Sequence, residues 1–184
     1  MWVLHTADRC IEVNLELEEL QRRLIPFSRA HYQDDAVEVE DVFKMPGHAG
    51  FAYGFSVQTA SARDKWYIRL PPPDVKLQGT ADVLRQVAAL SVMPDSVPHC
   101  TVKWSGDDPQ WFGRPYFIVP QLEGDVVKLT GDGWVEALEQ SARVGMAQQA
   151  IDALVKIHRL DWREAQYLGE PMAFEDDVVR WDRF

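Results

Sequence analysis

Hydrophobic positions change their spacing along the chain, and the changes predict the order of the elements. Residues 12–30 carry leucines at Leu17, Leu20 and Leu24 with charged residues between them, which is the spacing of an amphipathic helix. Pro26 is expected to end or kink this helix, because proline lacks a backbone N–H and its ring crowds the preceding turn. The chain therefore begins with one predicted helix.

From Val37 onward the spacing becomes that of strands. The stretch VEVEDVFKM starts at Val37, alternates valines and then breaks the alternation, which predicts a strand with a bulge. YGFSVQTA at 53–60 and KWYIRL at 65–70 have the aromatic and β-branched content of strands, and the polar turn SARD separates them. Three short strands joined by turns predict an antiparallel meander.

The next segment predicts a helix followed by two more strands. Apolar residues recur on one helical face between residues 80 and 92, and Thr80 is the expected N-cap. VPHCTVKWSG at 97–106 and RPYFIVPQLEG at 114–124 have strand composition, and a proline ends the apolar part of the second. Together with the meander, these two strands would complete a five-stranded sheet.

The remainder of the chain is predicted to be helical. One long helix is expected over 133–159 and a short one over 175–181. The pattern divides the chain into an N-terminal helical segment, 1–35, a β-rich lobe, 36–122, and the start of a helical lobe, 123–184. The predicted fold class is α+β.

Charge is distributed unevenly, and the distribution limits the kinds of ligand. The 184 residues carry a formal net charge of −10, which argues against a nucleic-acid-binding protein. Residues 1–45 hold 5 basic and 10 acidic side chains, and residues 119–184 hold 7 and 13. The middle, 46–118, holds 7 basic and 6 acidic side chains. A small anion would meet the least repulsion there.

Cysteine content and hydropathy predict a cytoplasmic protein. Cys10 and Cys100 are far apart and lack metal-type spacing, so two free, partly buried thiols are expected. No apolar run approaches the ~18 residues of a membrane span. Asp8 and Arg9 come too early for the apolar core of a signal peptide. We therefore expect no membrane contact.

A single arginine stands near the end of the third predicted strand. In KWYIRLPPP, Arg69 follows Ile68, and three prolines prevent the strand from continuing. Strand alternation decides whether Arg69 faces solvent, as most arginines do, or a cleft. In a cleft it would be a cation for an anionic ligand.

Five motifs in order resemble the aminoglycoside phosphotransferase and choline kinase-like family, which is related to the protein kinases. They are PGHAGFAYGFSV, WYIRLPPP, LRQVAAL with VPHCTVKW, GRPYFIVPQLEG and AIDALVKIHRLDW. They are similar to the family's nucleotide loop, third strand, following helix and strand, hinge, and first large helix. The resemblance runs from about residue 37 to the end. It implies a protein-kinase-like N-terminal lobe, a five-stranded antiparallel sheet plus a helix, followed by the first helices of a helical C-terminal lobe.

The resemblance implies a site for ATP or another nucleoside triphosphate. Its residues would be Gly47, His48, Ala49, Gly50, Arg69, Gln86, Pro120 and Leu122. Arg69 would pair with the α- and β-phosphates, and Gln86 stands where the family has a glutamate that pairs with the strand cation. The Pro120 carbonyl and the Leu122 N–H would bind adenine.

The nucleotide loop departs from the family pattern. Gly47 and Gly50 allow backbone N–H groups to approach phosphate. Ala49, Gly50 and Ala52, however, replace the usual serine, asparagine and threonine. The loop has therefore lost side-chain donors, and a hairpin turn would use its glycines for its own reasons.

The family's H-G-D-x-x-x-x-N motif does not occur in the 184 residues. We therefore assign no catalytic and no metal residue in this chain, and Mg²⁺ would bind only if a C-terminal half is present. His158 is interpreted as a packed or capped histidine of the long helix, and Asp161 is not interpreted as catalytic. Two hypotheses remain. One is the nucleotide-binding part of an ATP-dependent phosphotransferase acting on a small-molecule hydroxyl, and the other is a non-catalytic nucleotide-binding or interaction module. Either form could be a homodimer, because the long helix has an apolar face.

Overall fold

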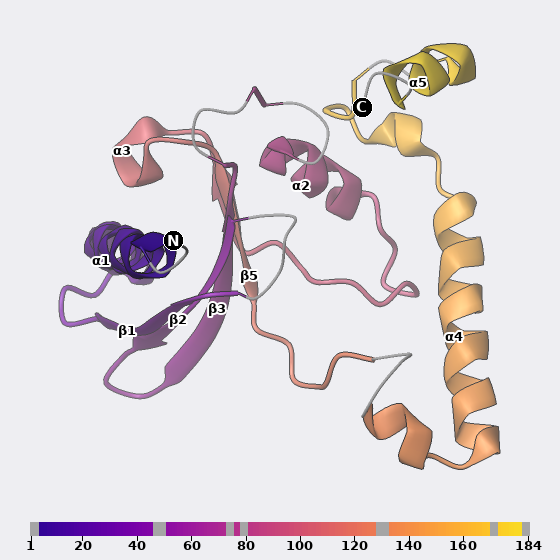
Figure 1. Cartoon of the computed structure of the whole chain (residues 1–184), viewed down its shortest axis with the longest axis horizontal. Helices are drawn as coiled ribbons and strands as arrows, with labels where there is room; N and C mark the ends of the chain where they lie inside the picture. The colour runs from indigo at the N-terminus through magenta and orange to yellow at the C-terminus, as the bar shows by residue number, and fades with distance from the viewer. Residues whose placement is uncertain are drawn as a thin grey trace.

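The computed structural model describes residues 4–45, 51–72, 76–77, 81–127, 133–169 and 173–181, with side chains of the first range from residue 16 onward. Figure 1 shows the elements in chain order. They are α1 (Leu4–Tyr32), β1 (Glu38–Lys44), β2 (Phe51–Gln58), β3 (Arg63–Leu70), α2 (Val83–Ser91), β4 (Trp104–Gly106), α3 (Pro109–Phe112), β5 (Tyr116–Pro120), η2 (Trp134–Ala137), α4 (Gln140–His158), η3 (Trp162–Glu164) and α5 (Phe174–Trp181).

The five strands form one antiparallel sheet in the order β1-β2-β3-β5-β4. This confirms the predicted α+β fold class and the meander, and helices follow the sheet as expected. The predicted bulge is also present, because the β1–β2 register shifts between Glu40 and Phe43, and Asp41 has a φ of 51°. The order places β3 at the centre of the sheet, with β2 and β5 beside it.

α1 covers one face of the sheet. Leu20, Leu24 and Phe27 are buried in the same core as Tyr53 and Ile68 of the strands. The Phe27 ring meets those of Trp104, Trp111, Phe112 and Tyr116 at centroid distances of 5.2–5.9 Å. This aromatic cluster fixes the helix against the sheet.

Pro26 was predicted to end or kink α1, and an end at Pro26 is wrong, because the helix continues to Tyr32. A proline inside a helix costs about 3 kcal/mol. Leu24 and Phe27, on either side of it, are 0% and 1% exposed. Burial of two large apolar side chains stabilises by about 1.5–3 kcal/mol each, which is enough to offset that cost.

α2 covers the opposite face, as Figure 1 shows. Val83 packs with Phe117 and Val119 of β5. The N-cap is Asp82, whose carboxylate accepts hydrogen bonds from the N–H groups of Leu84 and Arg85. Thr80, the predicted N-cap, lies outside the described residues and precedes this cap by two positions. An aspartate satisfies the first free N–H groups as well as a threonine does.

The strand predicted over 97–106 is much shorter than expected. Only Trp104–Gly106 form β4, and the chain before them runs without strand structure. Pro98 cannot donate to a ladder, which favours irregular backbone in this segment. The short helix α3 between β4 and β5 was not predicted. Asp108 caps it and Gly113, with φ 69°, ends it, which are ordinary helix signals in a four-residue element.

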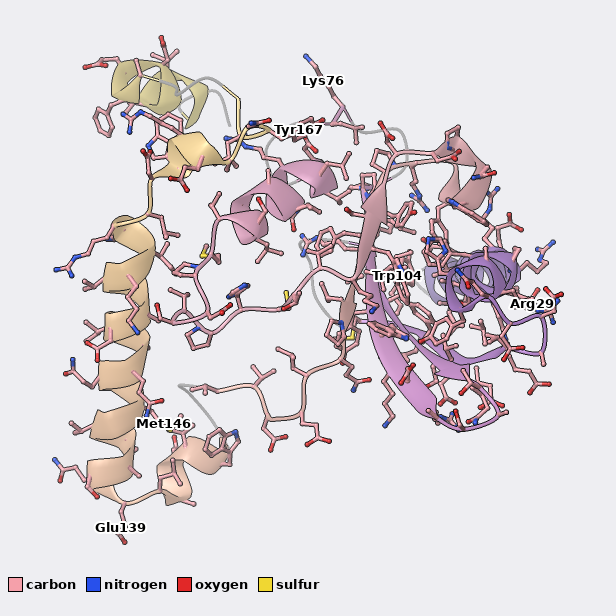
Figure 2. All side chains as sticks on the ribbon, turned by 180° about the vertical axis from the view of Figure 1, so that it is seen from behind. Arg29, Lys76, Trp104, Glu139, Met146 and Tyr167 are labelled. Carbon is pink, nitrogen blue, oxygen red and sulfur yellow. The ribbon has the colours of Figure 1, made fainter. Side chains whose placement is uncertain are left out.

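The helix predicted over 133–159 is divided into η2 and α4 by extended backbone at Leu138 and Glu139. Helical spacing in a sequence does not distinguish one helix from two consecutive ones. Figures 1 and 2 show α4 standing apart from the sheet. Its side chains are mostly exposed, and the predicted packing of His158 is wrong for this reason. Among the described residues, no helix is both long and apolar enough to cross a membrane.

Candidate functional site

The central strand presents different side chains to the two faces of the sheet. Trp66, Ile68 and Leu70 belong to the core under α1. Tyr67 packs with the cluster under α2, and Arg69 follows it by two residues. Since side chains two apart share a face of a strand, Arg69 also points to the α2 side. Arg69 is therefore half-buried on a central strand, and the solvent-facing alternative for it is wrong.

A cavity of about 570 Å³ lies on this face, between the sheet and α2. The lining is mainly apolar, with one guanidinium and one carboxamide. Its members are Met45, Ala52, Tyr67, Ile68, Arg69, Gln86, Ala89, Leu90, Cys100, Phe117 and Val119. A cavity of this size with a few polar groups among apolar walls is typical of small-molecule sites.

The sheet register fixes the surroundings of Arg69. It pairs with Ala52 of β2 and with Phe117 of β5. Ala52 is small, so it leaves space beside the arginine on this face. Phe117 is 6% exposed and provides an apolar wall. The sequence placed Ala52 in the nucleotide loop, whereas the structure places it within β2.

α2 brings Gln86 into the same cavity as Arg69. Val83, Gln86 and Leu90 are separated by three and four residues, so they lie on one face of the helix. Val83 is 1% exposed and fixes that face toward the sheet. Gln86 is half-buried there.

The two predicted hinge residues are not among those that line the cavity. Pro120 is the last residue of β5, where it pairs with Trp66, and Leu122 follows with 63% of its surface exposed. The Gln121 N–H donates to the Lys65 carbonyl at 2.9 Å and extends the β3–β5 contact past Pro120. Val119, the residue before the predicted hinge, does line the cavity. The predicted hinge residues therefore follow directly after a residue that lines the cavity.

The predicted nucleotide loop lies outside the described residues. This applies to Gly47, His48, Ala49 and Gly50 alike. The residues on either side of the loop are described, and both Met45 and Ala52 line the cavity. The Met45 N–H donates to the Ala52 carbonyl at 2.9 Å, so the two ends of the loop are held together.

Several lining residues were not predicted, although the sequence contains a signal for some. Tyr67 precedes Arg69 by two positions in a strand, and Phe117 precedes Val119 by two. The period of two would have placed each pair on one face. Cys100 has no such signal, because its segment has no regular structure. Cys100 is free and half-buried, as predicted, whereas the side chain of Cys10 is not described.

Carboxylates are scarce around the cavity. None of the described residues that line it is acidic. In the described part of the chain, no group of three or more histidine, cysteine, aspartate or glutamate side chains is placed to hold a metal ion. The arrangement can therefore bind a ligand with an apolar part and an anionic part, and its described lining offers no carboxylate or imidazole for proton transfer.

Comparison with known proteins identifies the family. A family model described as the phosphotransferase enzyme family (APH) matches residues 49–183. A search of curated protein sequences finds no match. Among solved structures, a crystal structure from Ralstonia eutropha JMP134, of a protein assigned as an aminoglycoside phosphotransferase, matches with a TM-score of 0.57 and 19% identity.

The match to that structure covers 88% of this chain and 46% of the other. This chain thus spans less than half the length of the solved relative. At 19% identity the likeness shows a common fold. The family model covers most of the chain independently of that structure. The chain belongs to the phosphotransferase enzyme family.

Proposed function

We propose that this chain is the nucleotide-binding part of an ATP-dependent phosphotransferase that phosphorylates a hydroxyl group of a small molecule. The observation that carries the proposal is the cavity under α2, in which Arg69 and Gln86 share apolar walls with Tyr67, Phe117 and Val119. A nucleoside triphosphate has the matching chemistry, because it joins a flat apolar base to a polyanion.

Arg69 would bind the α- and β-phosphates. A guanidinium is always charged and can donate two parallel hydrogen bonds to one phosphate group. The loop between Met45 and Ala52 would supply backbone N–H groups at the same end of the cavity, with Gly47 and Gly50 allowing close approach. Gln86 would position the guanidinium through its carboxamide oxygen. It brings no charge, in contrast to the glutamate that the family has there.

The base would lie toward β5. Tyr67 and Val119 form a register pair across β3 and β5, so their side chains stand next to each other on the cavity face. The Pro120 carbonyl and the Leu122 N–H follow directly and would bind the edge of adenine. A proline suits this position, because only its carbonyl is needed.

Transfer of a phosphoryl group to a substrate requires catalytic residues that this chain does not provide. Phosphoryl transfer depends on a base for the substrate hydroxyl and on metal ligands that neutralise charge. The H-G-D-x-x-x-x-N motif that supplies them in the family is not in these 184 residues. Within the described ranges, no cluster could hold Mg²⁺. We therefore assign Mg²⁺ and the hydroxyl substrate to the complete phosphotransferase, of which 123–184 would begin the helical lobe.

The second candidate is a nucleotide-binding or interaction module without catalysis. It is favoured by the loss of side-chain donors at Ala49 and Ala52 and by the neutral Gln86. The two candidates differ in whether an H-G-D motif is encoded after residue 184, and only the nucleotide-binding form of the second would share the nucleotide in the cavity.

The experiment is a calorimetric titration of ATP and of adenosine into the chain and its Arg69→Ala variant. Hydrogen bonds to charged groups contribute roughly 1.5–3 kcal/mol, so the variant should bind ATP about tenfold or more weakly. Adenosine lacks phosphates, and its affinity should be unchanged. Gln86→Glu should strengthen ATP binding by giving Arg69 a charged partner.

Arg63→Ala is the matched control. Arg63 lies at the other end of β3 and pairs with Glu40 at 3.0 Å, away from the cavity. This variant should bind both ligands like the unmodified chain. If Arg69→Ala weakens ATP and adenosine equally, the phosphate role of Arg69 is wrong. If the unmodified chain binds neither ligand, the proposed function is wrong.

A further inference from the structure

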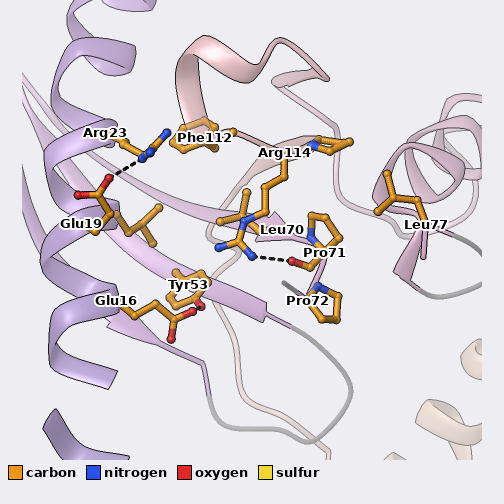
Figure 3. Close-up of a pocket in the computed structure, with 13 residues that line it drawn as sticks. Glu16, Glu19, Arg23, Tyr53, Leu70, Pro71, Pro72, Leu77, Phe112 and Arg114 are labelled. Carbon is orange, nitrogen blue, oxygen red and sulfur yellow. Dashed lines mark hydrogen bonds and ion pairs between the residues drawn. The ribbon is translucent and has the colours of Figure 1, made fainter. Parts of the chain in front are cut away.

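A second cavity lies on the opposite face of the sheet. It has a volume of about 560 Å³ and opens where α1 approaches the ends of β2 and β3 and the turn between α3 and β5 (Figure 3). Both acidic and basic side chains surround an apolar floor. The lining residues are Glu16, Glu19, Leu20, Arg23, Tyr53, Leu70, Pro71, Pro72, Leu77, Phe112, Gly113, Arg114 and Pro115.

The two carboxylates of this cavity already have partners. Glu16 accepts a hydrogen bond from the Tyr53 hydroxyl and forms an ion pair with the Lys44 ammonium at 3.3 Å. Glu19 accepts from Arg23 Nε at 2.7 Å and pairs with Arg22 at 3.2 Å. A cationic ligand would therefore have to displace one of these cations from its carboxylate.

The Arg114 guanidinium is placed differently. In Figure 3 it projects into the cavity between Tyr53 and Pro71. It donates to the Pro71 carbonyl at 2.9 Å, and within the described ranges this is its one hydrogen bond. A guanidinium has five N–H donors, and among the described residues no carboxylate forms an ion pair with Arg114. Arg114 is therefore the group in this cavity best able to bind an anion.

The apolar floor would accommodate the rest of such a ligand. Leu20, Leu70 and Phe112 are 3–5% exposed and form its base, and Leu77 stands at the rim with 46% of its surface exposed. A ligand with a short hydrocarbon body could bury that body here while its head group meets Arg114.

We propose that this cavity is a binding site for a small organic oxyanion, with Arg114 as the anchor of the head group and the floor of Leu20, Leu70 and Phe112 as the site of its apolar body. The site is distinct from the proposed nucleotide site. The two lie on opposite faces of β2 and β3, because Tyr53 and Leu70 line one and their neighbours Ala52 and Arg69 line the other.

The test is a calorimetric titration of the chain with three probes. Hexanoate has an oxyanion on an apolar body, hexylamine has the same body with a positive charge, and inorganic phosphate has an oxyanion without a body. Hexanoate should bind saturably, hexylamine should not bind, and phosphate should bind at least tenfold more weakly than hexanoate.

Two variants and a control locate the site. Arg114→Gln removes the charge and should weaken the binding of hexanoate by roughly ten- to hundredfold. Leu77→Glu keeps the Arg114–Pro71 contact and adds a carboxylate at the rim of the cavity, so it should weaken the binding of hexanoate by charge repulsion. This variant keeps the test valid even if Arg114→Gln does not fold. Arg143→Gln removes an exposed arginine of α4, far from the cavity, and should bind hexanoate normally.

The outcomes separate the alternatives. Binding of hexylamine in preference to hexanoate would overturn the proposal in favour of a cation site at Glu16 and Glu19. Phosphate binding as tightly as hexanoate would overturn the role of the apolar floor. Absence of hexanoate binding, or binding that neither Arg114→Gln nor Leu77→Glu weakens, would overturn the site itself. None of these results depends on whether ATP binds to the other face.

Discussion

Replacing Tyr32 by phenylalanine would remove a single oxygen atom that joins α1 to the central strand. The Tyr32 hydroxyl donates to Asp64 Oδ2 at 2.7 Å and accepts from Trp66 Nε1 at 2.8 Å. Asp64 and Trp66 both belong to β3. The hydroxyl therefore connects the last residue of α1 to two residues of the strand that carries Arg69.

The two lost hydrogen bonds should have different costs. Trp66 is 8% exposed, so its indole N–H would remain buried without a partner. Asp64 is half-buried, and water can replace the lost donor there. A buried polar group without a partner costs about 1–3 kcal/mol, so we expect Tyr32→Phe to lower the free energy of unfolding by about 2 kcal/mol. For a chain of this size, that corresponds to a Tm about 4–8 °C lower.

The assay is urea unfolding followed by tryptophan fluorescence, with thermal unfolding as a second measurement. Tyr167→Phe is the matched control, because Tyr167 is 55% exposed and lies beyond α4. The control should unfold like the unmodified chain. If Tyr32→Phe is also unchanged, the hydroxyl contributes nothing net and the reasoning about the buried indole is refuted.

Three other predictions concern the whole chain. The pKa values of Tyr32 and Tyr53 are raised above the ordinary 10.0. Burial is the larger cause, and the second is the neighbouring carboxylate, that of Asp64 for Tyr32 and that of Glu16 for Tyr53. The unfolded chain loses these protons first, so stability should be constant below pH 10 and fall above it, with a smaller fall in Tyr32→Phe. A urea midpoint that stays constant from pH 9 to 11.5 would contradict this. The exposed face of α4, with Val144, Ile151 and Leu154 at 50–61% exposure, should make the chain associate, and Ile151→Gln with Leu154→Gln should reduce association in light scattering. If light scattering shows a monomer at all concentrations, the inference that the apolar face of α4 drives association is contradicted. Finally, the pure chain should transfer no phosphate from ATP, and turnover clearly above the buffer rate would show that it contains its own catalytic groups.

The pattern of hydrophobic residues predicted the sheet well, because large hydrophobic side chains recur at every second position in its strands. Tyr53, Phe55 and Val57 alternate with smaller residues, and the break in β1 gave the bulge. The same local rules failed where distant contacts decide the structure. The helix passes through Pro26 because residues on both sides are buried against strands that lie later in the sequence.

The candidate site could be predicted in part for the same reason. Arg69 and Gln86 were found through motifs, and the structure brings both to one cavity. Cys100 was missed because its place depends on how an irregular segment crosses under α2. The second cavity, lined by Glu16 and Arg114, was not predicted at all, because these two residues lie almost a hundred positions apart in the sequence. No local pattern marks such a pair.

Binding of a nucleotide in the cavity under α2 can be tested most directly through Cys100, which lines that cavity. In a Cys10→Ser background, Cys100 is the one remaining thiol of the chain. The measurement is the rate at which a thiol reagent labels Cys100 at increasing ATP concentration, with hexanoate as a ligand for the other face. If a nucleotide binds in this cavity, ATP should slow labelling saturably, Arg69→Ala should shift the half-maximal concentration about tenfold upward, and hexanoate should give no protection. Labelling at the same rate with and without saturating ATP would contradict nucleotide binding there.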